Sequence, residues 1–302
     1  MKVAITGATG LIGKKLVGKL LERGDEVLVL TRSANSAKNT FPHSVSFIEW
    51  NTNSKLWYSK LSGVDAVIHL AGENVMGRRW SESHKKKILD SRINGTKSIV
   101  EAISSLSEKP KTFISASAIG IYGNREAPVD ESSEPANDFL ANVVKAWEYE
   151  TAKVDEFGIR RVNVRVGIVL DEKEGALAPM IKQFKFFLGG SIGSGKQWFS
   201  WIHVDDIVGI FLFALDNEAV SGAVNGTSPV SVRMKDFAVA LGKVMHRPAL
   251  FTVPEFALRV VLGEGAGAVL GGANVRSEKI CKLGYKFQFE NLEAALKNIL
   301  HK

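Results

Sequence analysis

An apolar run, Val3-Ala4-Ile5, leads directly into three closely spaced glycines at positions 7, 10 and 13. Glycine has no Cβ, so it permits a tight turn, close approach of the backbone to a ligand and close packing of a helix on a strand. A helix is expected from residue 11 to about residue 23, and a second strand over residues 26–30. A unit of strand, glycine turn, helix and strand is typical of a dinucleotide-binding site, with the diphosphate at the helix N-terminus.

The end of the second strand bears on which dinucleotide is bound. An NAD site usually has a carboxylate about 20 residues beyond the glycines, bonded to the ribose 2′-hydroxyl. Here the strand ends in Thr31, Arg32 and Ser33. A guanidinium suits a 2′-phosphate, and the two hydroxyls can donate hydrogen bonds to it. The sequence therefore favours NADP(H) over NAD(H), although a solvated arginine at a strand exit is the simpler alternative.

Composition limits the class of protein. A chain of 302 residues, 45% hydrophobic and 24% charged, fits one large or two modest domains. It opens on a strand, so no signal peptide is expected, and no apolar run approaches the roughly 18 residues of a membrane span, so no membrane partner is expected. Cys281 is the only cysteine, which suits a reducing cytoplasm, and the six histidines show no metal-ligand spacing.

The net charge of +7 is spread along the chain, and its densest cluster is Lys85-Lys86-Lys87. A lysine cluster in a helical stretch usually marks a solvated helix face, and the chain has no recognised nucleic-acid motif. We therefore expect no nucleic-acid partner. A mildly basic surface would instead attract an anionic cofactor or substrate.

Strand-like and helical segments alternate through the first half of the chain, which predicts an α/β protein with a doubly wound parallel sheet of the Rossmann type. Ligands of such sheets bind at the carboxyl ends of the strands, so the residues after Ile5, Leu30, Leu70, Ser117 and Val166 should surround one cleft. The further strands are expected at 45–49, 66–70, 112–117 and 161–166, and the long helices at 81–106 and 138–157.

After residue 170 the regular alternation of strand-like and helical segments gives way to glycine-rich and mixed segments. We interpret residues 1–170 as the NADP-binding domain and 171–302 as a smaller substrate-side lobe. Segments near 200–230 are expected to return to the first domain, and a small C-terminal domain is expected at about 250–300.

Several motifs together resemble those of the extended short-chain dehydrogenases/reductases, and in particular the branch called "epimerase family protein", whose members carry a small C-terminal domain of unknown function. The similarity covers nearly the whole chain. The matching segments are TGATGLIG at 6–13, HLAGENV at 69–75, RRW at 78–80, SRINGT at 91–96, SASAIGIYG at 115–123, FLANVVKAWE at 139–148, GGSIGSGKQWFSWIHVDD at 189–206 and the tail over 259–295.

The resemblance extends the expected cofactor site. It implies that the turn after the fourth strand contacts the dinucleotide, that Arg92 helps to hold it and that Arg165 and Gly167 lie near the nicotinamide half. A helix-surface ion pair is the alternative for Arg92. The cofactor-contacting residues expected in all are Gly7, Thr9, Gly10, Leu11, Ile12, Gly13, Thr31, Arg32, Leu70, Ala71, Gly72, Arg92, Lys145, Arg165 and Gly167.

The catalytic set of this superfamily is a serine, a tyrosine and a lysine, and here it is incomplete. Ser117 fits the serine, which orients the substrate oxygen. The tyrosine should lie four residues before Lys145, but that position holds Ala141. A literal Tyr149…Lys153 pair falls eight residues too late, about 12 Å farther along the helix and turned by about 80° from the required face. Tyr122, in a glycine-bordered loop, could donate a proton instead if the loop folds inward.

Other side chains are candidates for the substrate pocket. Glu73 could act as a base, or it could bind a ribose hydroxyl or an arginine. Arg79 could bind an anionic group or pair with a surface carboxylate. The expected pocket residues are Glu73, Asn74, Arg79, Trp80, Trp198 and Trp201. For His203, Asp205 and Asp206 a structural role, such as capping a helix, is favoured over chemistry.

These observations favour an NADP(H)-dependent oxidoreductase or epimerase acting on an unknown small molecule, with Ser117 orienting the oxygen and Tyr122 or a water moving the proton. A non-catalytic NADP-binding redox sensor or scaffold is the alternative that Ala141 keeps open. A nucleotide-sugar epimerase of ordinary mechanism conflicts with the same alanine. A homodimer is possible, because relatives of this class often pair through the helices flanking the sheet.

Overall fold

A computed structural model describes residues 1–301 of the chain. Its centre is a seven-stranded, all-parallel sheet with the strand order β12-β7-β5-β4-β1-β2-β3. The doubly wound parallel sheet predicted from the alternation of segments is thus confirmed. Its strands are β1 Lys2–Thr6, β2 Glu26–Thr31, β3 Ser46–Glu49, β4 Ala66–His69, β5 Thr112–Ala118, β7 Arg160–Val166 and β12 Gly222–Gly226.

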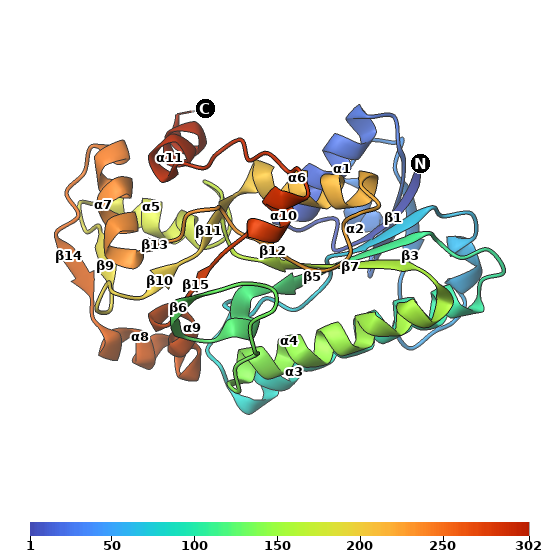
Figure 1. Ribbon diagram of the computed structural model, residues 1–302, viewed down its shortest axis with the longest axis horizontal. Coiled ribbons are helices and arrows are strands. Elements are labelled where there is room, and N and C mark those ends of the chain that lie inside the picture. Colours follow the sequence, from blue (N-terminus) through green and yellow to red (C-terminus); the bar gives the residue numbers. More distant parts are fainter. Residues whose placement is uncertain (302) are drawn as a thin grey trace.

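Helices cover both faces of this sheet (Figure 1). One face carries α1 (Leu11–Glu22) and α6 (Val204–Asp216), and the other carries α3 (Glu82–Ser105) and α4 (Phe139–Ala152). The long helices match the predicted ones within a few residues because side chains fix their starts: Ser81 caps α3, and Asp138 accepts the N–H of Ala141 in α4.

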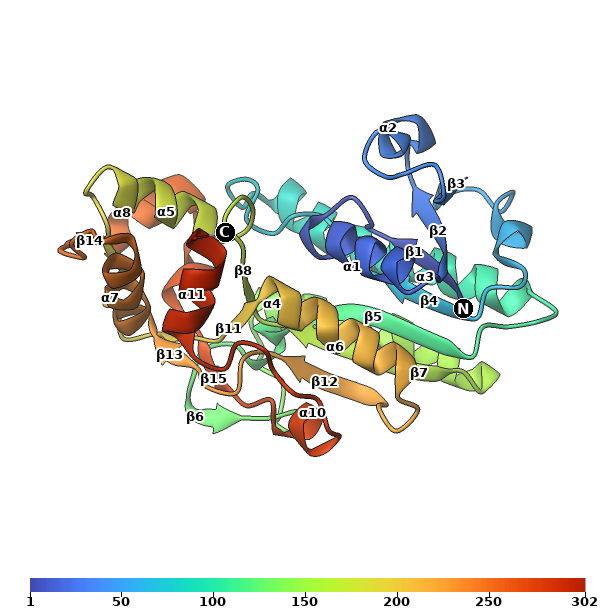
Figure 2. The same cartoon turned by 90° about the horizontal axis from the view of Figure 1, so that it is seen from above.

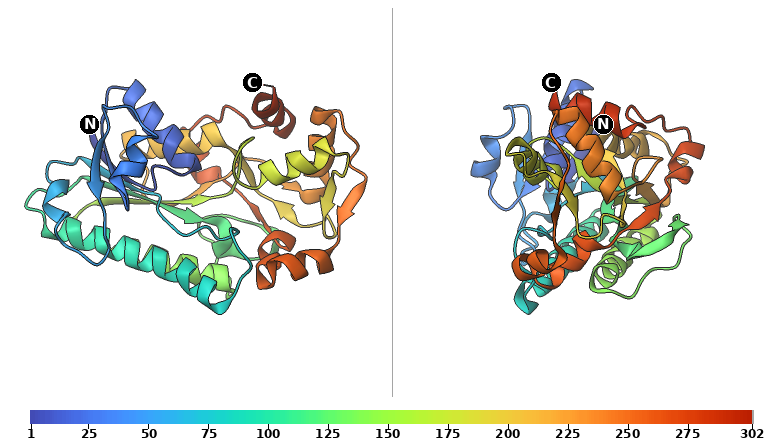
Figure 3. Two further views of the ribbon diagram at one scale, coloured as in Figure 1. Left: turned by 180° about the vertical axis from the view of Figure 1, so that it is seen from behind. Right: turned by 90° about the vertical axis from the view of Figure 1, so that its left-hand side faces the viewer.

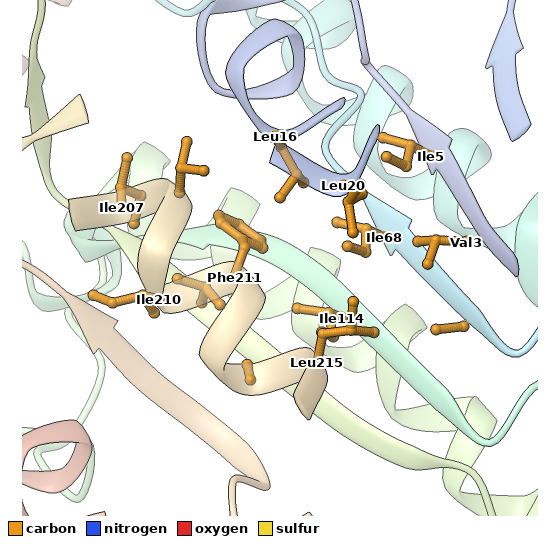
Figure 4. Packing of buried hydrophobic residues seen from close by; sticks show 14 of the residues in the cluster. Val3, Ile5, Leu16, Leu20, Ile68, Ile114, Ile207, Ile210, Phe211 and Leu215 are labelled. Carbon is orange, nitrogen blue, oxygen red and sulfur yellow. The ribbon is translucent and has the colours of Figure 1, made fainter. Parts of the chain in front are cut away.

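The larger core lies between the sheet and the α1/α6 layer. Figure 4 shows Leu16 and Leu20 of α1 and Phe211 and Leu215 of α6 pointing toward Ile68 and Ile114 of the sheet. A second core fills the α3 side and includes Phe113, Ile99 and Val67. The central strands are apolar on both faces, as a parallel sheet covered by helices requires.

The remaining elements build a smaller lobe beside the sheet (Figure 2). It has its own core, which includes Phe184, Phe237 and Leu296. Its elements are β6 Arg125–Val129, β8 Ile168–Leu170, α5 Leu177–Lys185, β9 Gly190–Ile192, β10 Trp198–Phe199, β11 Trp201–His203, β13 Val232–Arg233, α7 Met234–Met245, β14 Phe251–Val253, α8 Glu255–Leu262, η4 Glu264–Ala266, α9 Gly267–Leu270, β15 Ala273–Val275 and α11 Leu292–Leu300. Helix α10, Glu278–Lys282, packs instead on the sheet domain beside β12, and its Ile280 belongs to the larger core. The short helices α2 Ala34–Lys38, η1 Tyr58–Leu61, η2 Ile119–Tyr122 and η3 Lys153–Phe157 complete the chain.

The chain crosses between the two parts more than once. After β11 it returns to the sheet through α6 and the edge strand β12, and then continues into β13 and α7 (Figure 3). Asp206, fully buried at the start of α6, accepts the backbone N–H groups of Gln288 and Phe289 and contacts the Tyr285 hydroxyl. These bonds fasten the C-terminal segment to the sheet domain.

Within residues 1–301, no helix combines the length and the apolar character that crossing a membrane requires.

Candidate cofactor and active site

A cleft of about 710 Å³ opens at the carboxyl ends of the central strands, where the chain reverses its direction of winding between β1 and β4. This is the place where open parallel sheets bind ligands. Nine of the expected site residues line it: Gly7, Thr9, Gly10, Thr31, Arg32, Leu70, Ala71, Gly72 and Glu73. The residues after β5 and β7 were expected to surround the same cleft but do not line it.

The glycines of the first turn serve different needs. Gly7 has φ of +69°, and a Cβ there would lie 2.7 Å from the carbonyl carbon of Leu70. A Cβ on Gly13 would lie 2.4 Å from the carbonyl oxygen of Gly7. Both glycines therefore let backbone pack on backbone. Gly10 is different, because its Cβ would meet only the Gly7 oxygen, at 3.4 Å, and Gly10 lines the cleft.

The N-terminus of α1 is built to face an anion. Its N-cap is Gly10, which offers no side-chain cap, and the first turn contains no acidic residue. The N–H groups of Leu11, Ile12 and Gly13 belong to the first turn, which has no acceptor within its own helix. A diphosphate in the cleft would supply that acceptor and would meet the positive end of the helix dipole.

A buried cluster beneath the cleft fixes the turn after β4. The Thr6 hydroxyl oxygen accepts the N–H groups of Leu70 and Ala71, and it lies 2.7 Å from Nδ1 of His69. We infer that the Thr6 proton points to Nδ1, so that the Nε2 proton points to the Thr96 hydroxyl 3.2 Å away. His69 is therefore neutral. Its burial, with a smaller contribution from the charge of Arg92, lowers its pKa from 6.5 to about 4.

The far end of the cleft combines Arg32, at the end of β2, with the residues that follow β3. Arg32 is exposed there. The Ser33 hydroxyl is already engaged, since it accepts the N–H of Ser36 as the cap of α2 and donates to the Ser36 hydroxyl. Glu49 also lines this end and lies opposite Thr31 in the sheet register. One guanidinium and one carboxylate thus flank the site expected for the ribose of the adenosine.

Arg92 binds the backbone of the turn that lines the cleft after β4. Its guanidinium donates to the carbonyl oxygens of Glu73 and Ile88 and lies over the Trp147 ring at 5.0 Å. A Cβ on Gly72 would lie 3.3 Å from it. Burial lowers the pKa of Arg92 to about 10. In this arrangement Arg92 holds the turn over residues 70–73, and direct contact with the cofactor stays a prediction.

Ser117 and Arg165 meet at a carboxylate that the sequence did not single out. They are paired in register on β5 and β7, so their side chains lie on the same face of the sheet. The Ser117 hydroxyl donates to Oε1 of Glu148 at 2.6 Å, and Arg165 donates to both oxygens of Glu148 at 2.9 Å. Arg165 therefore engages a protein carboxylate with its side chain.

The Tyr122 hydroxyl lies in the same network and is fully buried. It donates to Oδ1 of Asn225 at 2.7 Å and accepts from Arg165 at 2.9 Å. Burial raises its pKa to about 12, although Arg165 opposes the shift. The loop does fold inward, but it places the phenol behind Arg165 and not at the cleft lining. Proton transfer by Tyr122 stays a prediction that this position does not favour.

On α4, Ala141 is fully buried, and Lys145 lies one turn on with its ammonium 3.4 Å from the Asn137 side-chain oxygen. Tyr149 is 69% exposed, and its ring lies beside Lys153 on the helix surface. The structure therefore agrees with setting Tyr149 aside as the acid. Gly167 follows β7, where a Cβ would lie 2.7 Å from the carbonyl oxygen of Ser200.

The expected substrate-side residues fall into two groups. Glu73 lines the cleft, and its N–H donates to Ser91. The loop that follows contains Asn74, Arg79 and Trp80. The backbone N–H of Trp80 donates to the carbonyl oxygen of Leu262, its indole N–H donates to the carbonyl oxygen of Val75, and its ring packs on Phe139. This loop joins the sheet domain to the C-terminal segment.

The two tryptophans of the small lobe lie apart from the cleft. Trp198 is stacked under Arg233, whose guanidinium lies 3.7 Å from its ring centre and pairs with Glu126. Trp201 is 1% exposed and borders a smaller cavity of about 290 Å³. Their place in a substrate pocket stays a prediction.

Sequence reasoning missed the cleft residues Glu49, Trp50, Asn51, Thr52, Ser91 and Gly95. Glu49 ends a strand that was correctly located and the next three residues follow it, so the rule about carboxyl strand ends could have found all four. It also missed Glu148 and Asn225. A carboxylate on an amphipathic helix gives no sign of facing inward until the neighbouring strands are in place.

The chain was compared with known proteins. Residues 3–225 match the model of the NAD dependent epimerase/dehydratase family, and residues 253–299 match a domain of unknown function, DUF1731. The chain is 38% identical to the epimerase family protein YfhF of Bacillus subtilis, covering 99% of this chain and 98% of that protein. It is 41% identical to the chloroplastic epimerase family protein SDR39U1 homolog of Arabidopsis thaliana, covering 99% and 87%.

Two solved structures are similar. The human epimerase family protein SDR39U1, crystallised with NADPH, gives a TM-score of 0.88 at 33% identity and covers 100% of this chain and 99% of its own. A UDP-glucuronic acid 4-epimerase from Bacillus cereus, in complex with UDP-glucuronic acid and NAD, gives a TM-score of 0.80 at 20% identity, covering 99% and 98%. The second likeness concerns the fold alone.

The neutral, buried His69 predicts how stability depends on pH. Because its pKa is about 4 in the folded chain and about 6.5 unfolded, the unfolded chain binds the proton first as pH falls. The contribution of neutral His69 to the free energy of unfolding is complete above pH 6.5 and decreases toward pH 4, by up to about 3 kcal/mol. Chemical denaturation across this range should show a flatter profile for His69→Gln than for the wild type. A matched change at exposed His43 should keep the wild-type slope; an equal slope in all three proteins would contradict a neutral His69.

Proposed function

Because this chain belongs to the NAD dependent epimerase/dehydratase family, we propose that it is an NADP(H)-dependent oxidoreductase or epimerase-type enzyme acting on a small molecule. The observation that carries the proposal is the cleft of about 710 Å³ between β1 and β4. It is lined by the glycine turn before α1, whose N-terminus has no side-chain cap, and by Arg32. That volume lies within the range of roughly 300–1,000 Å³ usual for cofactor sites.

The residues that line the cleft fit the diphosphate and the adenosine end of the proposed cofactor. The turn after β1 would hold the diphosphate with its N–H groups, since Gly10 has no side chain to fill that space. Arg32 would bind the 2′-phosphate, for which its charge and donor geometry are suited. The human relative crystallised with NADPH supports the phosphorylated form. Glu49, at the same end, is the group that would favour an unphosphorylated ribose.

In the proposed reaction a bound nicotinamide would exchange a hydride with a substrate carbon. The Ser117 hydroxyl would give up its bond to Glu148 and orient the oxygen on that carbon. Arg165 holds Glu148 in place through two hydrogen bonds. With alanine at position 141, the proton that the substrate oxygen gains or loses would be exchanged with water, relayed by the Ser117 hydroxyl.

Cofactor choice tests the first part of the proposal. Arg32→Asp removes a positive charge from the 2′-phosphate and adds a negative one, so affinity for NADPH should fall about 10- to 100-fold relative to NADH. Fluorescence titration of both cofactors measures the ratio. Arg78→Asp, at an exposed arginine that does not line the cleft, should leave the ratio unchanged. An unchanged ratio in Arg32→Asp would remove the argument for NADP(H).

Turnover tests the second part. NADPH oxidation should be screened over a panel of aldehydes, ketones and sugar nucleotides, and Ser117→Ala should reduce kcat on any active substrate by about 100-fold. Ser115→Ala is the matched control, because Ser115 lies on the same face of β5 and its hydroxyl bonds only the Ala116 carbonyl oxygen. Tight cofactor binding with no turnover on the panel would favour the non-catalytic sensor instead.

A further inference from the structure

Exposed apolar side chains are concentrated in the small lobe. Of the fourteen large hydrophobic residues exposed over residues 1–301, eight come from two short segments of this lobe. Five flank the start of the β9–β14 pair, namely Phe186, Phe187, Leu188, Leu250 and Phe251. The other three lie on α8, namely Phe256, Val260 and Val261. We call these eight residues the apolar surface.

The chain segments that lead into β9 and β14 are neighbours in the fold. The Phe251 N–H donates to the carbonyl oxygen of Gly189, and the Arg247 guanidinium lies 4.4 Å from the Phe187 ring centre. Helix α8 begins directly after β14, at the end of the molecule away from the N-terminus (Figures 1 and 2). None of the eight residues of α8 is buried, so this helix contributes little to the cores.

Phe187 is held in a strained conformation while half exposed. Its φ is +60°, a region that favours glycine. The Phe187 N–H donates to Phe184 and the Leu188 N–H to Gln183, so Phe187 occupies the position after a helix end where glycine is usual. A phenylalanine there costs conformational free energy, and 54% of its surface stays in water. Within the fold its ring is contacted by the Arg247 guanidinium, and about half of the side chain remains exposed.

The area is large for a surface without a partner. The four phenylalanines of the apolar surface are 66%, 54%, 53% and 73% exposed. At roughly 150–250 Å² for each side chain, they present on the order of 400–600 Å² together. The three beside β9 and β14, Phe186, Phe187 and Phe251, account for roughly 260–430 Å² of this, which overlaps the range of about 300–600 Å² for the largest apolar patch of a typical monomer.

The charge around the apolar surface indicates the kind of partner. Segments 182–190 and 246–262 carry Lys182, Lys185, Arg247 and Arg259 against a single acid, Glu255, so their net charge is four minus one, or +3. A second copy docking through the same surface would bring +3 against +3, which is unfavourable. An anionic partner is complementary to this charge.

We propose that the apolar surface docks onto a lipid bilayer with anionic headgroups. The phenylalanines and the α8 valines enter the headgroup boundary, and the lysines and arginines keep their charges at the phosphates. The chain then rests on the bilayer and does not cross it. The sequence-based expectation of no membrane partner considered only a spanning apolar run, and vesicle binding tests it. The proposal is independent of the proposed reaction.

Co-sedimentation of the full chain with vesicles tests the proposal. Binding should be stronger to phosphatidylcholine vesicles containing phosphatidylglycerol than to pure phosphatidylcholine vesicles, and it should weaken as salt rises. A triple variant, Phe186→Ser with Phe187→Ser and Leu188→Ser, should lose at least about tenfold in partitioning. A second triple variant in α8, Phe256→Ser with Val260→Ser and Val261→Ser, should lose a similar amount.

The matched control is Leu56→Ser with Val239→Ser, which removes two exposed apolar side chains outside the apolar surface and should bind as the wild type does. Circular dichroism melting establishes that each variant is folded. Equal sedimentation with both vesicle types, or full binding by both folded triple variants, would overturn the proposal. Dimerisation that the same triples abolish, without vesicle binding, would overturn it in favour of a second copy.

Discussion

The close contact between the glycine turn after β1 and the backbone after β4 is the constraint on which the rest of the site depends. Gly7 leaves no room for a Cβ against Leu70, and Gly13 leaves none against Gly7 itself. Thr6 joins the two turns from below by accepting the N–H groups of Leu70 and Ala71. With these turns held together, the N-terminus of α1 opens onto the cleft beside Gly10 and meets whatever anion lies there.

Local signals made much of the fold predictable. The caps of α3 and α4, the apolar runs of the central strands and the glycine turn each act within a few residues, so the sequence alone located them. The return of segments near 200–230 to the sheet domain was expected, but the pairing of β12 with β7 was not. The bonds of Asp206 to Gln288 and Phe289 were not predicted either, because both sets of contacts join residues about 60 to 80 positions apart. No short-range pattern carries such information.

The candidate site likewise contains residues that local sequence patterns predict and residues that they do not. Its glycines and Arg32 were found because their spacing follows from the chemistry of the dinucleotide. The group around Ser117 was not, since Glu148 is brought to Ser117 and Arg165 only when α4 lies across β5 and β7. For Tyr122 the sequence suggested the inward fold of the loop but not the partners of the side chain. Its hydroxyl is bonded to Arg165 and Asn225. Around Ser117 the chain has a buried, charged network, and alanine stands at position 141.

Equilibrium binding of NADPH to the purified chain tests the central claim most directly. Titration followed by nicotinamide fluorescence should show one saturable site in the wild type and a loss of that site in folded Gly7→Ala, whose added methyl would press on Leu70 and Ala71. A folded wild type that takes up neither NADPH nor NADH in a saturable way, or a Gly7→Ala variant that binds as well as the wild type, would contradict it.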